Sequence, residues 1–207
     1  LGGDFEPGTG DFYIAMVASF PSVGTQFVMS KADSGTQGLN VFLTTTLTTD
    51  LTFRPQTSGG TTNNLQQSNV VDSSFHTIVA RRVSSTLGSE YDGSAFTTDN
   101  GSKVNDGDMN NNANFRIGSS STGGLDTDMD LAEALIAVGT LSDEDLQRTS
   151  GYLSHKYGLA SNLPATHSYK SFAPAFGLHG VHNQDLIGEL ALDVSGPLVS
   201  DTLAGAV

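Results

Sequence analysis

The segment DLAEALIAVGTLSDEDLQRTSGYLSHKYGL, residues 130–159, holds the two clearest secondary-structure signals of the chain. Its first part continues the β-prone apolar run at residues 128–138, which predicts a strand. The remainder predicts a helix, because Ser142 can cap the first turn and the acidic residues 143–145 suit the positive end of the helix dipole. Gly158 then favours a helix stop. The segment therefore predicts a strand followed directly by one short helix.

Seven further stretches are typical of strands, and Gly, Ser, Thr, Asn and Asp are abundant between them. These stretches are residues 11–19, 25–33, 39–46, 51–57, 75–83, 89–96 and 114–118. Asp92 and Gly93 form a strong hairpin-turn signal, whereas residues 58–68 are typical of a loop. The pattern predicts an all-β fold.

Charge and composition exclude several classes of function. Lys and Arg number 9 against 22 Asp and Glu, which gives a formal charge of -13. A surface this acidic repels phosphate backbones, so we expect no nucleic-acid partner. No apolar run approaches the roughly 20 residues that a membrane-spanning helix needs, so we expect no membrane insertion. The 207 residues include no Cys, which excludes disulfides and thiolate metal sites.

Five segments, in this order, resemble the laminin-G-like branch of the concanavalin A-like lectin/glucanase superfamily. They are FEPGTGDFYIAMVAS (5–19), FHTIVARRV (75–83), SEYDGSAF (89–96), NFRIGSSSTGG (114–124) and the closing segment 130–159. The resemblance implies an antiparallel jelly-roll β-sandwich with one short C-terminal edge helix. Phe75 and Tyr157 stand where the family usually carries Trp, which this chain lacks.

The character of the sequence changes after residue 160. We expect residues 1–160 to form the concanavalin A-like sandwich and residues 161–207 to form a linker and a C-terminal attachment tail. A tail of this length is too short for a core of its own. GELALDVSGPL, residues 188–198, resembles repeats at the ends of phage structural proteins. We therefore expect residues 161–207 to bind other virion or surface-assembly proteins, and we expect a homo-oligomer.

One loop has the alternating oxygen ligands of a calcium site. Asp106, Asp108 and Asn110 are the candidate metal ligands, although the loop lacks the glycine and the closing glutamate of a complete calcium loop. A solvated acidic turn is the alternative. No other cofactor is expected.

A sugar site in a β-sandwich needs an aromatic ring to stack on the sugar and polar groups to bind its hydroxyls. Tyr91 lies beside the predicted turn and is the best candidate ring, with Asp92 and Asn100 as polar partners. Most other aromatic residues in strands are expected to be core.

Residues 128–133 contain the one acidic string that resembles a glycosidase. Retaining glycosidases need two carboxylates about 5 Å apart. Asp128 and Asp130 share one face of a regular strand, and Glu133 lies on the other unless a bulge turns it. We therefore expect no enzymatic activity, and we expect Glu133 to be a hydrogen-bonded structural carboxylate.

Two functions stay open. The first is a non-catalytic structural or recognition protein on the exterior of a virus particle, such as a phage capsid decoration, fibre or tail component, with host-surface glycans as a further ligand. The alternative is a carbohydrate-binding module of a secreted or cell-surface bacterial protein. Both readings predict a location on the virion surface or outside the cell.

Overall fold

The computed structural model describes residues 5–32, 38–43, 50–57, 65–94, 97–98 and 107–174. Within these residues, ten strands and one helix follow one another. They are β1 (Phe12–Ser19), β2 (Gln26–Ser30), β3 (Gly38–Leu43), β4 (Leu51–Gln56), β5 (Leu65–Gln67), β6 (His76–Val83), β7 (Thr86–Tyr91), β8 (Thr97–Thr98), β9 (Arg116–Ile117), β10 (Asp130–Val138) and α1 (Asp143–Lys156).

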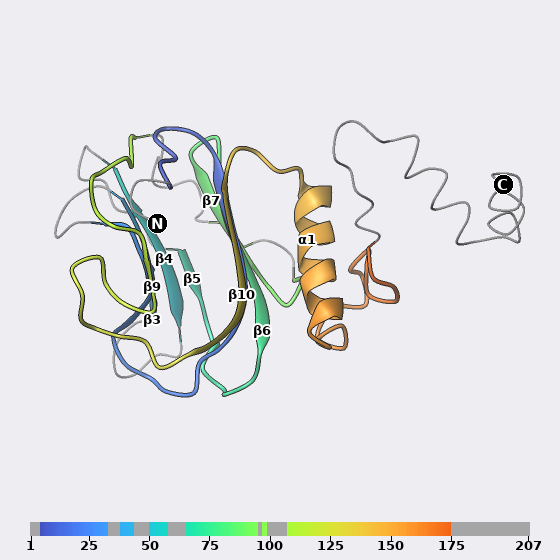
Figure 1. The fold of residues 1–207 in the computed structure, drawn as a ribbon. Helices are drawn as coiled ribbons and strands as arrows, with labels where there is room; N and C mark the ends of the chain where they lie inside the picture. The colour runs from blue at the N-terminus through green and yellow to red at the C-terminus, as the bar shows by residue number, and fades with distance from the viewer. Residues whose placement is uncertain are drawn as a thin grey trace, which may run out of the picture. The chain divides into compact units, whose positions relative to one another are not determined.

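The strands form two five-stranded sheets that stack face to face (Figure 1). We call β10-β1-β6-β7-β8 the first sheet and β5-β4-β3-β2-β9 the second sheet. Neighbouring strands within each sheet are antiparallel. The predicted all-β jelly-roll sandwich is confirmed. Strand β5 falls within the stretch predicted as loop, because its sequence, LQQ, has only one apolar residue.

Strand β1 is apolar on both faces, because the second sheet packs on one side of the first sheet and helix α1 packs on the other. Ile14 and Met16 are fully buried in the core between the two sheets. Ala15 and Val17 point the other way and pack with Leu146 of α1 in a second apolar cluster. Because side chains alternate along a strand, a continuous apolar run predicts a strand that is covered on both faces.

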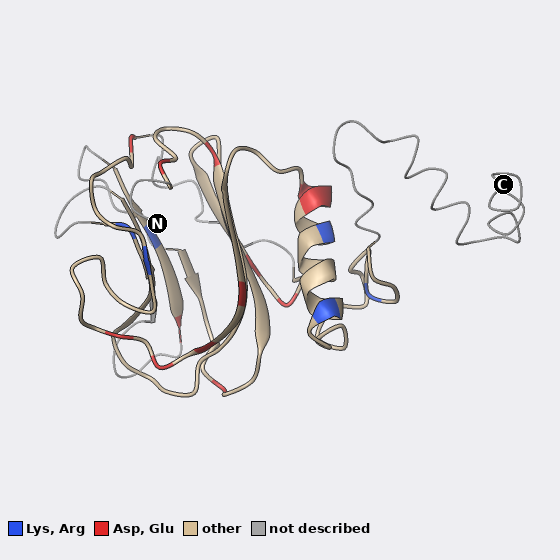
Figure 2. Cartoon of the chain, in the orientation of Figure 1, with Lys and Arg blue, Asp and Glu red and all other residues tan. Residues whose placement is uncertain are grey.

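Helix α1 forms as the capping residues predict. The Ser142 hydroxyl accepts a hydrogen bond from the Asp145 backbone N–H at 3.1 Å, and Figure 2 shows acidic residues on the first turn and basic residues further along. At the other end Gly158 has a φ of +73, and the Leu159 N–H donates to the Ser154 carbonyl at 2.6 Å. The helix covers the outer face of the first sheet rather than lying beyond its edge. No helix in the described part of the chain has the length and apolar character to span a bilayer.

The first compact unit runs from Leu1 to Ala173, past the boundary expected at residue 160. Residues 161–173 belong to it because they pack on α1: the buried His167 ring makes a 3.1 Å hydrogen bond with Ser150, and the His155 ring makes a 2.8 Å hydrogen bond with the Tyr169 carbonyl. The second unit is Pro174–Val207, of which residues 175–207 lie outside the described part of the chain. The attachment role of the tail stays a prediction.

Candidate ligand-binding pocket

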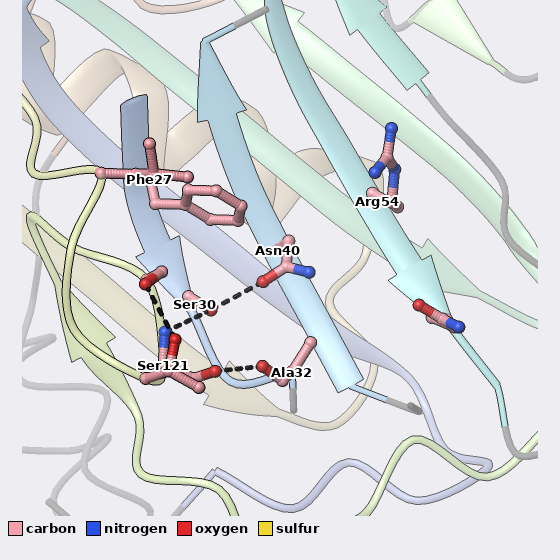
Figure 3. A pocket seen from close by; sticks show the side chains of 10 residues that line it. Phe27, Ser30, Ala32, Asn40, Arg54 and Ser121 are labelled. Carbon is pink, nitrogen blue, oxygen red and sulfur yellow. Dashed lines mark hydrogen bonds between the residues drawn. The ribbon is translucent and has the colours of Figure 1, made fainter. Parts of the chain in front are cut away.

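A pocket of about 360 Å³ lies on the outer face of the second sheet, between β2, β3 and β4 and the loop at residues 118–125 (Figure 3). We call it the sheet pocket. Its described lining residues are Phe27, Ser30, Ala32, Asn40, Arg54, Gln56, Ser120, Ser121, Thr122 and Leu125.

Strand register brings the polar side chains of the sheet pocket together. Ser30 pairs with Asn40 across β2 and β3, and Asn40 pairs with Arg54 across β3 and β4. The neighbours of these residues along the strands, such as Leu39 and Phe53, are buried in the core between the sheets. Alternation of side chains therefore turns the row Ser30–Asn40–Arg54 outward.

Hydrogen bonds within the row orient the Asn40 amide. The Ser30 hydroxyl donates to Asn40 Oδ1 at 2.7 Å and accepts from the Ser121 N–H at 3.1 Å. Because the Asn40 oxygen is engaged by Ser30, its NH₂ group is the part that faces a ligand as donor. The pocket floor thus offers hydrogen-bond donors from Asn40 and Arg54.

The loop at residues 118–125 closes one side of the sheet pocket, and its glycines allow the chain to turn. Gly123 and Gly124 have φ of +83 and +104, in a region that L side chains rarely adopt. The loop is tied to β2, since the Phe27 N–H donates to the Leu125 carbonyl at 3.0 Å and the Ser121 hydroxyl donates to the Ala32 carbonyl. This wall is therefore anchored to the strand that carries the Phe27 ring.

The charge of the sheet pocket differs from that of the whole chain. Arg54 is the one charged residue among its described lining residues, which include no Asp or Glu, although the chain has a formal charge of -13. An aromatic ring, an oriented amide and a guanidinium can hold a planar or polar ligand that carries hydrogen-bond acceptors or a negative charge.

Tyr91 and Asp92, two of the three residues predicted to bind sugar, lie elsewhere, in a hydrogen-bonded network at the end of β7. The Tyr91 ring stacks on His76 with centroids 4.6 Å apart. Asp92 Oδ2 lies 2.6 Å from His76 Nδ1, and Asp92 Oδ1 accepts the Thr77 N–H at 2.9 Å. Asp92 and Gly93 both have positive φ, as the predicted turn requires. The network does not line the sheet pocket; a ligand at Tyr91 and Asp92 stays a prediction, and Asn100 lies outside the described residues.

Two carboxylates hold the His76 ring from opposite sides. Asp72 contacts His76 Nε2 at 3.0 Å, and Asp92 contacts Nδ1. Burial lowers the pKa of His76, but the hydrogen bonds and charges of Asp92 and Asp72 outweigh it and raise the pKa above its ordinary value. Burial also raises the pKa of the Tyr91 hydroxyl, with Asp92 and Asp72 adding to the effect. The network is a structural tie between β6 and the β7 turn.

Oxygen atoms of the proposed calcium loop are used within the protein. Asp108 Oδ1 accepts the Asn110 N–H at 2.9 Å, and Asn110 Oδ1 accepts the Gly8 N–H at 2.7 Å. Asp106 lies outside the described residues. No group of three His, Cys, Asp or Glu residues that could hold a metal occurs among the residues that the structure describes. Calcium at Asp106, Asp108 and Asn110 stays a prediction.

Buried cations of the chain itself hold the same loop. Lys31, only 2% exposed, places its ammonium 2.7 Å from the Glu6 carboxylate and donates to the carbonyls of Asn111 and Ala113 at 3.3 and 3.0 Å. The fully buried Arg82 donates to the Gly107 carbonyl of this loop at 3.4 Å. Nothing in the local sequence pattern of these residues foretells this role.

Glu133 is a structural carboxylate, as expected. A register shift opposite Val17 bulges β10 and turns Glu133 toward α1. Its Oε2 accepts from Lys156 Nζ at 2.9 Å and from the Tyr157 hydroxyl at 3.0 Å. The hydrogen bond from Lys156 lowers the pKa of Glu133. The carboxylate ties the end of α1 to the edge strand.

The sheet pocket was not predicted from the sequence. The one local indication of the pocket is the alternation in LTFRPQ, residues 51–56. Leu51 and Phe53 lie on one face of this strand, and Thr52 and Arg54 lie on the other. Only the pairing of β2, β3 and β4 joins these positions into one site.

No family model matches the chain, and no curated protein matches it. Among solved structures, the chain is similar to the CBM40 of the Ruminococcus gnavus IT-sialidase, with 13% identity and a TM-score of 0.53, over 68% of this chain and 82% of that one. The same CBM40 bound to alpha2,3 sialyllactose matches with 14% identity and a TM-score of 0.52, over 66% and 80%.

The chain is also similar to the binding domain of botulinum neurotoxin DC in complex with rat synaptotagmin II, with 11% identity and a TM-score of 0.53, over 70% of this chain and 36% of that one. It spans about a third of the length of such toxin domains. At these identities the likeness shows the fold, a lectin-like β-sandwich.

Proposed function

We propose that the chain is a non-catalytic carbohydrate-binding module of a secreted or cell-surface protein, and that the sheet pocket holds the glycan. The observation that carries the proposal is the outward row Ser30–Asn40–Arg54 beneath an anchored loop, with the Phe27 ring beside it. A volume of about 360 Å³ accommodates one or two sugar rings.

The chemistry of the sheet pocket favours a glycan with an acidic sugar. Arg54 supplies the charge that a sugar carboxylate needs, and a guanidinium can bind it through two parallel hydrogen bonds. The Asn40 NH₂ group can donate to a ring or acetamide oxygen, and Phe27 offers an apolar surface for a sugar face. The similarity to a CBM40 solved with alpha2,3 sialyllactose supports this ligand class and suggests the first probe.

Calorimetric titration of the full chain with alpha2,3 sialyllactose and with lactose tests the proposal. We expect the sialylated sugar to bind at least about tenfold more tightly, because a charge-assisted hydrogen bond contributes roughly 1.5–3 kcal/mol. Arg54→Ala should remove that preference. Arg148→Ala is the matched control, since it deletes the same charge from α1, where the Arg148 side chain is 27% exposed and lies away from the sheet pocket. Equal affinities for the two sugars, or equal losses in both variants, would contradict the acidic-sugar assignment, and silence on a broad glycan array would overturn the proposal as a whole.

The role on a virus particle gains no support from the similar structures and stays a prediction. It would require a particle protein that binds the full chain, through residues 161–207 or a symmetric oligomer. Size measurement of the full chain by light scattering, with and without residues 175–207, addresses that reading separately from glycan binding.

A further inference from the structure

A second cavity, of about 300 Å³, lies on the side of the first sheet that α1 covers. We call it the helix cavity. Its described lining residues are Arg81, Glu90, Gly93, Ser94, Asp143, Gln147, Thr166 and His167. They come from β6, β7 and its turn, the first half of α1 and the segment that packs on the helix. With one glycine excepted, every one of these residues is polar, so the helix cavity suits a polar ligand.

Most charges around the helix cavity are already balanced. The Arg81 guanidinium pairs with the Asp143 carboxylate at 2.5 Å. His167 bonds to Ser150 through Nε2 and accepts the Tyr169 N–H through Nδ1 at 3.2 Å, so its ring is engaged at both nitrogens. Burial lowers the pKa of His167, and the charges of His155 and Lys170 lower it further, so the neutral ring is favoured.

Glu90 is the residue of the helix cavity whose carboxylate lacks a full set of hydrogen-bond partners. Its side chain is on the buried β7, the residue is only 2% exposed, and Oε1 has no hydrogen-bond partner among the described residues. Burial raises the pKa of Glu90 to about 7, although the Ser150 hydroxyl and Arg81 act in the opposite direction. A buried carboxylate without a full set of partners is costly, because desolvation is not repaid. A ligand that brings a donor with positive charge would repay it.

We propose that the helix cavity binds a small polyhydroxy ligand that carries a primary ammonium group, the hexosamine class. The ammonium would compensate Glu90, while Gln147, Ser94 and Thr166 offer amide and hydroxyl groups for the ligand hydroxyls. This site is separate from the sheet pocket, on the outer side of the other sheet, and does not depend on the proposed function.

Binding and proton release by Glu90 are linked. An ammonium ligand prefers the ionised carboxylate, so its affinity rises as the pH rises through about 7. A neutral sugar has no such preference. Arg81 and Asp143 form an ion pair with each other, and the lowered pKa of His167 separates its titration from that of Glu90, so the pH dependence reports Glu90.

Titration of the full chain with glucosamine, glucose and N-acetylglucosamine at pH 7.5 and pH 5.5 tests the proposal. We expect glucosamine to bind at pH 7.5 at least about tenfold more tightly than either neutral sugar, and to lose that advantage at pH 5.5. Glu90→Gln keeps the shape of the side chain and should remove the preference for glucosamine. Thr166→Val, at an exposed residue of the cavity rim, should weaken glucosamine binding without affecting folding.

Arg54→Ala is the control for site identity and should leave glucosamine binding unchanged. Glucosamine that does not bind at pH 7.5, or binds no better than glucose, would overturn the proposal. So would unchanged binding in both Glu90→Gln and Thr166→Val. None of these outcomes bears on sialyllactose binding in the sheet pocket.

Discussion

The two outer faces of the sandwich differ in what covers them. On the first sheet, Ala15 and Val17 are apolar and helix α1 lies over them (Figure 1). On the second sheet, Asn40 and Arg54 are polar, and no described helix lies over them. Both faces arise from the same alternation along strands, so the chemistry of alternate residues decides which face binds the chain's own helix and which presents polar groups. The outer face of the first sheet contributes to stability, whereas the outer face of the second sheet carries the pocket that we propose binds a glycan.

Truncating a leucine on each side is the most direct way to break this comparison. Leu146 is fully buried between α1 and the first sheet, whereas Leu125, at the sheet pocket, is 56% exposed. We expect Leu146→Ala to lower the free energy of unfolding by about 2–5 kcal/mol and Leu125→Ala by less than about 0.5 kcal/mol. Chemical denaturation measures both. Similar losses would show that the second sheet also depends on cover.

The pH dependence of stability also distinguishes the two faces, because the titratable Glu90 is buried on the side of the first sheet that α1 covers. The pKa of Glu90 is raised from 4.5 to about 7, so folding favours its protonated form. The contribution of Glu90 to the free energy of unfolding is therefore fully present below pH 4.5 and is lost as the pH rises through about 7. Glu90→Gln should therefore stabilise the protein by up to about 3 kcal/mol at pH 8 and change little at pH 4. Denaturation curves at the two pH values measure this, and an equal effect at both would contradict it.

Asp92 tests whether the Tyr91 network belongs to stability rather than to binding. The raised pKa of His76 means that its contribution is fully present below pH 6.5 and is lost as the pH rises through the folded-state value. Asp92→Asn should thus lower the free energy of unfolding by about 2 kcal/mol at pH 5.5 and by less at pH 8.5. Sialyllactose affinity should not change. A loss of affinity at unchanged stability would instead support a ligand site at Tyr91 and Asp92.

The smallest expected effect concerns the start of the covering helix. Ser142→Ala removes the side chain that accepts the Asp145 N–H and should lower the free energy of unfolding by about 1 kcal/mol. Ser142→Thr keeps a hydroxyl that can accept from the Asp145 N–H and donate to the Asp145 carboxylate, so it should restore most of the loss. Thermal melts of the three proteins are sufficient, and a Ser142→Thr variant as unstable as Ser142→Ala would contradict the capping role.

Local signals in the sequence were enough for the elements on the helix side. The cap at Ser142, the stop at Gly158 and the turn at Asp92 each depend on residues within a few positions of one another. The apolar character of β1 on both faces could also be read directly. Such features need no knowledge of long-range pairing.

The sites depend on contacts between distant segments, and for that reason they were not predicted. Asn40 and Arg54 become one surface only through strand register. Glu90 becomes a buried acid only in the folded chain, where Ser150 of the later α1 forms a hydrogen bond with it. Local sequence indicates which residues are polar, but it does not indicate which polar residues will share a cavity.

The buried Lys31 supplies a cation to the fold that does not have to come from the solvent. Its ammonium occupies a position among the Glu6 carboxylate and the carbonyls of Asn111 and Ala113, the kind of oxygen cluster that dissolved cations also favour. An ion delivered on a side chain has no dissociation constant and cannot be removed by a chelator. The cation at this site is therefore part of the covalent chain, so its presence does not depend on which salts are in the solution.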